Sequence, residues 1–157
     1  MKKSVKNINN FIYFAITLII LSFSDYYFAT WIVKKLSRGF VFNIPLLNLV
    51  YAENTGAAFN ILNDSNKFLA NFAIIVIFVV FLYLVNNISN TNKKFLFLLS
   101  LFTAGIFGNL YERLTLGYVR DFFELTFIDF PIFNISDIFI TISVIGFIIA
   151  ILFSRKI

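Results

Sequence analysis

The sequence contains no cysteine and no histidine among its 157 residues. These two absences exclude disulfide bridges, zinc or haem bound through either side chain, Ser-His-Asp triads and Cys-His dyads. If the protein is an enzyme, its acid–base groups must therefore come from Asp, Glu, Lys or Tyr. We expect it to use neither a metal ion nor a cofactor.

Charged residues are also scarce, at 13% of the chain, against about a quarter in typical soluble domains. Apolar residues make up 60%, and phenylalanine alone contributes 23 residues. The net charge of +5 does not indicate nucleic-acid binding, because the basic residues form small clusters beside the apolar runs, as membrane-flanking residues do. We therefore expect a protein that lies in membrane lipid and binds no nucleic acid.

Four long apolar segments are separated by shorter polar ones. They predict an all-α integral membrane protein, with one membrane-embedded domain over residues 1–157. The predicted transmembrane helices cover about residues 11–33, 67–86, 94–113 and 136–154. The first follows a short basic start, as a secretory signal peptide does, but its apolar run resumes after Asp25 and no A-x-A cleavage site follows. We therefore interpret it as a retained helix.

Two segments between the helices have a strand-like composition. The first contains FVFNI and LLNLVYA, which are rich in strand formers and are separated by Pro45. A turn is predicted at Asn54–Gly56. The second, GYVRDFFEL, follows the third helix and alternates as an extended segment does. We expect small extracytoplasmic β-rich or extended loop elements beside the four helices.

The distribution of charge predicts the orientation in the membrane. With four spans, both termini lie on the same side, and basic residues divide almost evenly between the two sides. All eight acidic residues, however, fall in the outer half or within the first helix, so the inner side is purely basic. The positive-inside rule then places both termini in the cytoplasm.

Polar residues gather at the outer ends of the third and fourth helices. Each of these apolar runs has only 16 residues, whereas a perpendicular span needs about 20, so each helix must take in polar residues at one end. Polar groups at membrane depth usually face a protein interior or a wet cavity. Five are expected at a similar depth, near the outer face: Asn109, Arg113, Asp121, Asn134 and Asp137.

Asp121 and Asp137 are the candidates for chemistry. Two carboxyl groups in contact cannot both ionise, so they share a proton. The ionised member can activate a water while the protonated member donates a proton, which hydrolyses a peptide without His, Cys or metal. As an alternative, Asp137 caps the fourth helix, and Arg113 pairs only with Glu112, Glu124 or lipid headgroups.

Three ordered motifs support the enzymatic interpretation. Residues 48–59 read NLVYAENTGAAF, residues 108–122 read GNLYERLTLGYVRDF, and residues 131–138 read PIFNISDI. With these motifs the chain resembles lipoprotein signal peptidases (signal peptidase II), the bacterial aspartyl enzymes with four membrane spans. The resemblance extends from the first predicted helix to the last.

The resemblance implies a role for each candidate residue. Asp121 and Asp137 correspond to the two catalytic aspartates. Four polar residues would bind the substrate backbone or orient these aspartates: Asn54, Asn109, Arg113 and Asn134. The turn that ends at Gly56 would present backbone groups with which an extended peptide can pair.

The resemblance also implies a substrate and a location. The substrate would be a prolipoprotein, cut just before a diacylglyceryl-modified cysteine, and it would enter sideways from the bilayer. The enzyme would lie in the bacterial cytoplasmic (inner) membrane, and we expect a monomer.

Three positions depart from the family's motifs. Asp25 is present, but the lysine usual four residues later is Ala29, so we treat Asp25 as structural or supporting. Glu112 replaces the usual aspartate of G-N-x-x-D-R, and Ala104–Gly105 replaces a Gly-Gly pair. None of these changes affects the two candidate aspartates.

Three other function classes fit the sequence less well. A small four-helix transporter would use Asp25 as its intramembrane carrier, but the two outer loops are longer than a simple bundle needs. A Ser-Lys protease requires both residues at one site, which no spacing here indicates. A purely structural protein would leave the polar cluster unexplained.

Overall fold

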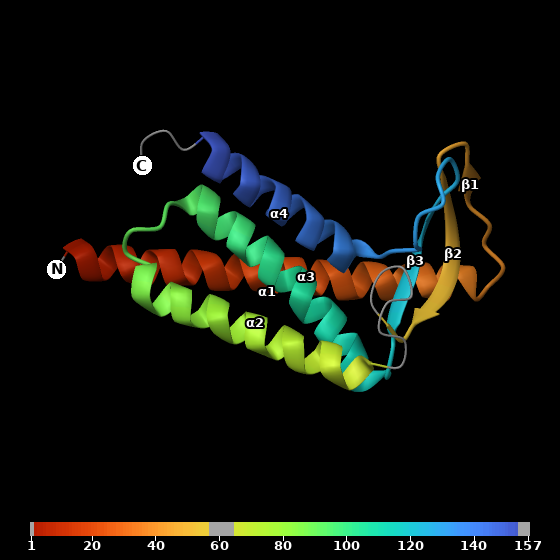
Figure 1. Cartoon of the computed structure of the whole chain (residues 1–157), viewed down its shortest axis with the longest axis horizontal. Helices are drawn as coiled ribbons and strands as arrows, with labels where there is room; N and C mark the ends of the chain where they lie inside the picture. Colours follow the sequence, from red (N-terminus) through yellow and green to blue (C-terminus); the bar gives the residue numbers. More distant parts are fainter. Residues whose placement is uncertain (1, 57–64, 154–157) are drawn as a thin grey trace.

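The computed structural model describes residues 2–56 and 65–153. Its elements are α1 (Lys2–Leu36), β1 (Asn43–Ile44), β2 (Leu47–Asn54), α2 (Asn66–Asn87), α3 (Lys93–Thr115), β3 (Val119–Leu125) and α4 (Ile135–Phe153). The helices form an elongated bundle with the small sheet at one end, and α1 begins and α4 ends at the opposite end (Figure 1). The last three residues of the first motif, 57–59, and the predicted end of the last helix at 154 lie outside the described residues.

The prediction of a four-helix membrane protein is confirmed. Each helix is long and apolar enough to cross a membrane, and α1 begins at Lys2 rather than near residue 11. α2 is apolar on all sides, as expected of a helix that faces lipid over much of its surface. Large exposed side chains of this helix include Phe72, Ile75, Phe78 and Phe81.

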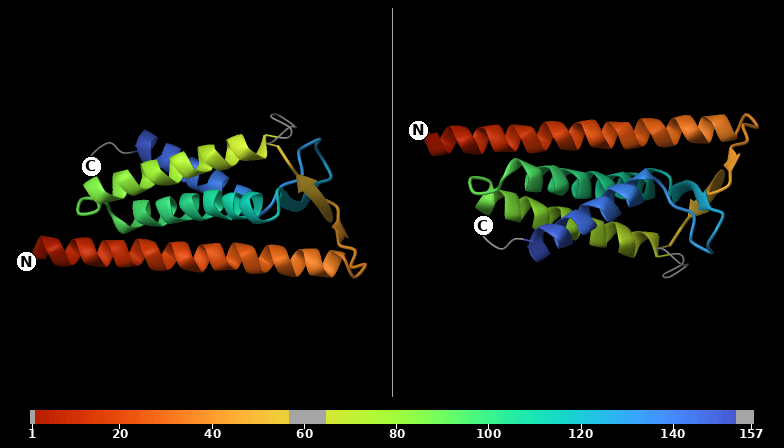
Figure 2. Two further views of the ribbon diagram at one scale, coloured as in Figure 1. Left: turned by 90° about the horizontal axis from the view of Figure 1, so that it is seen from below. Right: turned by 90° about the horizontal axis from the view of Figure 1, so that it is seen from above.

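Helix α3 is the centre of the bundle. It packs against each of the other three helices, and Figure 2 shows it between α1 on one side and α2 and α4 on the other. Small residues allow this close approach. A Cβ on Gly105 would collide with the backbone oxygen of Ser136 in α4, and one on Gly108 would collide with the Asp25 carboxylate of α1. Gly105 and Gly108 of α3 are therefore packing residues.

The three strands form one antiparallel sheet in the order β1-β2-β3. The chain turns from α3 into β3 at Gly117, whose φ of 86° favours glycine. In the β2–β3 register Ala52 lies opposite Asp121, and an irregularity in β2 separates this part of the ladder from Leu49. The strands confirm the predicted extended segments on either side of Pro45 and after Gly117.

The sheet is anchored to the bundle through an apolar cluster. Phe122 of β3 is fully buried and packs with Ala29 and Ile32 of α1. After β3 the chain folds back, and Phe133 bridges Phe123 before α4 begins. These contacts fix β3 and the start of α4 side by side at the end of α3.

Candidate active site

A cavity of about 470 Å³ lies where the sheet meets α3 and α4. Its polar lining residues come from β2, α3, β3 and α4, namely Asn54, Asn109, Arg113, Asp121, Asp137 and Thr141. The rest of the lining is mainly apolar and includes Phe130, Ile132, Ile138 and Ile142. A mostly apolar cavity with a few convergent polar groups is the usual form of a binding site.

Asp121 is held between two amide groups. It lies in β3, and only 2% of its surface is exposed. Its Oδ2 accepts a hydrogen bond from Asn54 Nδ2 at 2.9 Å, and its Oδ1 accepts one from Asn134 Nδ2 at 2.8 Å. The two donors come from opposite sides of the strand, so the carboxyl plane is fixed.

Asp137 lies in the first turn of α4 and is partly a helix cap, as the alternative interpretation predicted. Its Oδ2 accepts the backbone N–H of Asn134 at 3.2 Å, while its own N–H donates to Asn134 Oδ1 at 2.9 Å. This reciprocal pairing has the form of a capping box. The other oxygen, Oδ1, accepts from Asn109 Nδ2 at 2.8 Å, so capping uses only one side of the carboxyl group.

Two asparagines connect the two aspartates. The Asn134 amide nitrogen donates both to Asp121 and, at 3.0 Å, to Asn109 Oδ1. Asn109 in turn donates to Asp137. The two carboxyl groups are therefore members of one hydrogen-bonded chain, which runs Asp121–Asn134–Asn109–Asp137.

Arg113 reaches a backbone carbonyl, and among the described residues it forms no ion pair with an acidic side chain. Its Nη2 donates to the Gly56 oxygen at 3.0 Å, and its Nε is buried with no partner in the described part of the chain. The Gly56 N–H donates to Asn54 Oδ1 at 2.9 Å, which makes the turn rigid. The alternative in which Arg113 pairs with Glu112 or Glu124 is wrong, because those acids hold Arg120 and Asn48.

Burial and charge perturb Asp121. Burial, and then the neighbouring Asp137, raise the pKa of Asp121 from 3.8 to about 7, against hydrogen bonds from Asn54 and Asn134 that lower it. At neutral pH this carboxyl group is therefore protonated in a large fraction of molecules. Such a group can supply a proton, while a neighbouring carboxylate can accept one.

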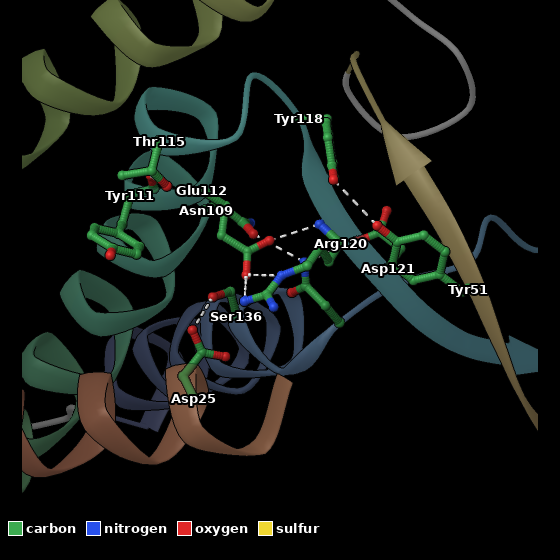
Figure 3. Close-up of polar contacts among 11 residues, drawn as sticks. Asp25, Tyr51, Asn109, Tyr111, Glu112, Thr115, Tyr118, Arg120, Asp121 and Ser136 are labelled. Carbon is green, nitrogen blue, oxygen red and sulfur yellow. Dashed lines mark hydrogen bonds and ion pairs between the residues drawn. The ribbon is translucent and has the colours of Figure 1, made fainter. Parts of the chain in front are cut away.

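Asp25 lies apart from this cavity. Figure 3 shows it against Ser136, whose Oγ donates to Asp25 Oδ2 at 2.7 Å. It lines a separate cavity of about 330 Å³ between α1 and α3, together with Glu112. Ala29, which stands where the lysine is usual, is buried in the apolar cluster beneath the sheet. Of the eight residues singled out from the sequence, Asp25 is the one placed outside the polar network.

Sequence reasoning missed two polar contacts beside the site. Glu112 pairs with Arg120 across the α3–β3 turn, and Ser136 is the partner of Asp25. Neither pair has a spacing that predicts contact, because each depends on tertiary packing. Among the described residues, no group of three or more acidic side chains is arranged to hold a metal ion.

Comparisons with known proteins agree with this architecture. Residues 15–153 match the family described as Signal peptidase (SPase) II. The chain is 38% identical over 134 residues to the lipoprotein signal peptidase of Streptococcus pyogenes serotype M5 (strain Manfredo), covering 84% of this chain and 88% of that protein. The protein of that name from serotype M1 gives the same identity and coverage.

Solved structures of membrane enzymes have a similar fold. A bacterial membrane enzyme determined by the in meso method at 2.3 Å resolution is similar, with a TM-score of 0.79 and 29% identity. The similarity covers 91% of this chain and 89% of that one. A second such structure, at 1.9 Å resolution, has a TM-score of 0.77 with the same identity.

Proposed function

The chain belongs to the signal peptidase II family, and we propose that it removes the signal peptide from diacylglyceryl-modified prolipoproteins by an aspartic mechanism. Family membership makes it a membrane protease of lipoprotein processing. The proposal adds the catalytic groups, Asp121 and Asp137, and the cleaved bond, which immediately precedes the lipidated cysteine. The product would be an apolipoprotein with that cysteine as its N-terminus.

One observation carries the aspartic mechanism. Asp121 and Asp137 line the same cavity, and a continuous chain of hydrogen bonds through two asparagines connects them. Asp137 also contributes to the raised pKa of Asp121. Such coupled carboxyl groups titrate as a pair and hold one proton between them.

The reaction follows from that shared proton. The ionised carboxylate takes a proton from a water molecule, whose oxygen attacks the scissile carbonyl carbon, while the protonated carboxyl group donates to the carbonyl oxygen. When the tetrahedral intermediate collapses, the C–N bond breaks and the cysteine nitrogen leaves with a proton from the pair. Asn54, Asn109 and Asn134 hold the two carboxyl groups in place through these steps.

The cavity walls suit the proposed substrate. Phe130 and Ile132, which precede α4, and Ile138 and Ile142 of α4 all line it, so an apolar peptide or acyl chain would meet apolar surface. Arg113, which lines this cavity, also holds the Gly56 end of the turn. We propose that this turn offers backbone groups to the extended substrate and that the substrate enters laterally from the bilayer.

We further propose that both termini lie in the cytoplasm and that the sheet lies at the outer face of the inner membrane. The beginning of α1 and the end of α4 share one end of the bundle, and the sheet occupies the other (Figure 1). Residues of β2 and β3 line the cavity, so it also lies at the sheet end. The segments at the end where α1 begins carry basic residues and no acidic ones, which suits the cytoplasmic side under the positive-inside rule. We expect the enzyme to act as a monomer in contact with membrane lipid.

The test is product identification. Purified protein is incubated with a diacylglyceryl-modified prolipoprotein, and the products are sequenced by mass spectrometry. We expect cleavage at the bond before the lipidated cysteine and none of the same precursor without lipid. Cleavage elsewhere, or equal cleavage of the unlipidated precursor, would contradict the proposed specificity.

A further inference from the structure

We propose that Glu112 is a positioning residue, which clamps β3 to α3 through Arg120 and so sets the separation of the two aspartates. This inference rests on the proposed aspartic mechanism. It concerns a position where the family's usual residue is aspartate and where this chain carries the longer glutamate.

The clamp consists of three hydrogen bonds. Glu112 Oε1 accepts from Arg120 Nε at 2.9 Å and from Nη2 at 2.6 Å. Glu112 Oε2 accepts from the backbone N–H of Arg120 at 2.7 Å. Figure 3 shows the two side chains facing each other across the turn, and their exposed fractions are 12% for Arg120 and 11% for Glu112. A charge-assisted pair with this little exposure holds its geometry far better than a surface ion pair.

The position of the clamp connects it to the chemistry. Arg120 immediately precedes Asp121, so a bond to the Arg120 backbone fixes the strand at the residue next to the carboxyl group. In the described part of the chain, these are the hydrogen bonds that join α3 to β3. The hydrogen bonds to Asp121 itself come from Asn54 and Asn134, neither of which belongs to α3.

Through these bonds α3 contacts both Asp137 and the strand that carries Asp121. Asn109, three residues before Glu112, donates to Asp137, and Glu112 holds the strand of Asp121. Both contacts start from one turn of a rigid, central helix. If Glu112 is lost, β3 can shift relative to α3 while Asp137 stays in place. A misplacement of about 1 Å can cost about 100-fold in rate.

The charge of Glu112 gives a readout that a purely structural role would not move. Glu112 contributes to the raised pKa of Asp121, together with burial and Asp137, while Arg113 and Arg120 are the nearby cations and Asp25 is a further nearby acid. Glu112→Gln removes a negative charge and frees the charge of Arg120, so both effects lower the pKa of Asp121. Arg120→Ala leaves Glu112 unneutralised and raises the pKa of Asp121.

The experiment measures kcat and KM against pH for wild type, Glu112→Gln, Arg120→Ala and the double variant. Glu124→Gln is the matched control, because Glu124 is in the same strand but accepts from Asn48. We expect Glu112→Gln to lower kcat about 10- to 100-fold with KM little changed. Arg120→Ala keeps the hydrogen bond from the backbone N–H of residue 120 to Glu112, so its kcat should fall less. The alkaline limb of the profile of kcat against pH should move to lower pH in Glu112→Gln and to higher pH in Arg120→Ala.

The double variant tests whether the two residues act as one unit. We expect it to be no slower than Glu112→Gln alone, because contacting residues are not additive. Three results would overturn the clamp. They are a wild-type kcat in Glu112→Gln, additive losses of kcat in the double variant, and an alkaline limb that moves in the same direction in both single variants. If Glu112→Gln does not fold, Arg120→Ala alone tests the clamp. A lower kcat with the alkaline limb at higher pH supports the clamp, and wild-type behaviour overturns it.

Asp121→Asn, measured in parallel, separates this inference from the proposed function. If Asp121→Asn cleaves as wild type does, the aspartic mechanism fails. If Asp121→Asn is inactive while Glu112→Gln behaves as wild type, only the clamp fails.

Discussion

Asp121 owes its perturbed acidity to opposing contacts that can be changed one at a time. Burial and Asp137 raise its pKa to about 7, and the amides of Asn54 and Asn134 lower it. In the proposed mechanism the pair must keep one proton, so activity falls as pH rises through the pKa of the protonated member. In that mechanism burial, Asp137 and the two amides together set the alkaline limit of catalysis.

The substitution Asn54→Ala tests this residue-scale account. The Asn54 amide donates to Asp121 and favours its ionised form, so removing the amide raises the pKa of Asp121 further. We expect the alkaline limb of kcat/KM to move to higher pH. Asn48→Ala is the control, since Asn48 is in the same strand but donates to Glu124. A limb that stays in place or moves to lower pH would refute the assignment of that limb to Asp121.

At the scale of elements, α3 organises the molecule because small residues let two helices approach it. Gly108 faces Asp25 of α1 and Ser136 of α4, and those two side chains hydrogen-bond to each other beside it. A side chain at this position would separate three helices at the height of the proposed active site. The same helix carries Asn109, Glu112 and Arg113, so its packing and its polar contacts are linked.

Gly108→Ala should therefore be much more harmful than an equivalent change elsewhere. Its new methyl group meets a carboxylate and a hydroxyl that are already paired, and overpacking of this kind typically costs about 1–3 kcal/mol. Gly146→Ala is the matched control, because its methyl group meets only the flexible side chain of Leu98, at 2.7 Å for the nearest atom. The measurement is the thermal unfolding midpoint of both variants in detergent. Equal midpoints would contradict the packing role of Gly108.

The elements were largely predictable from the sequence, and the polar pairings in part. Long apolar runs predicted the four helices, and β-rich composition with Pro45 and Gly117 predicted the strands. The motif residues were expected to gather near one membrane boundary. Their partners were not predictable, because Arg120 meets Glu112 and Ser136 meets Asp25 only after helices and strand have packed. Arg113 was expected at the site and lines the cavity, but its bond to the Gly56 carbonyl was not predictable.

At the scale of the whole molecule, the bundle has two chemically different ends. One carries the sheet and the cavity with its coupled acids. The other carries the α2–α3 turn, which is tied to α1 by Asn10 through the Ile88 and Thr91 carbonyl oxygens. Lys6 and Lys93 line a polar cavity there. This asymmetry supports the proposed orientation, with the basic end in the cytoplasm.

The absence of cysteine makes the orientation directly measurable. Single cysteines are introduced as Asp129→Cys in the exposed loop after β3 and as Asn90→Cys in the α2–α3 turn. A membrane-impermeant thiol reagent added outside intact spheroplasts should label the first and not the second. Permeabilisation should expose both, and the unmodified chain supplies the blank. Labelling of Asn90→Cys alone in intact cells would reverse the orientation.

The most direct test of the whole account is prolipoprotein cleavage by Asp121→Asn and Asp137→Asn, with Asp129→Asn as an exposed acidic control. Each asparagine keeps the size of the side chain but can no longer hold or transfer the shared proton. We expect both variants to fold and to lose at least about 100-fold in cleavage rate, while the control keeps wild-type activity. Undiminished cleavage by either folded variant would contradict the proposal that Asp121 and Asp137 together perform the hydrolysis.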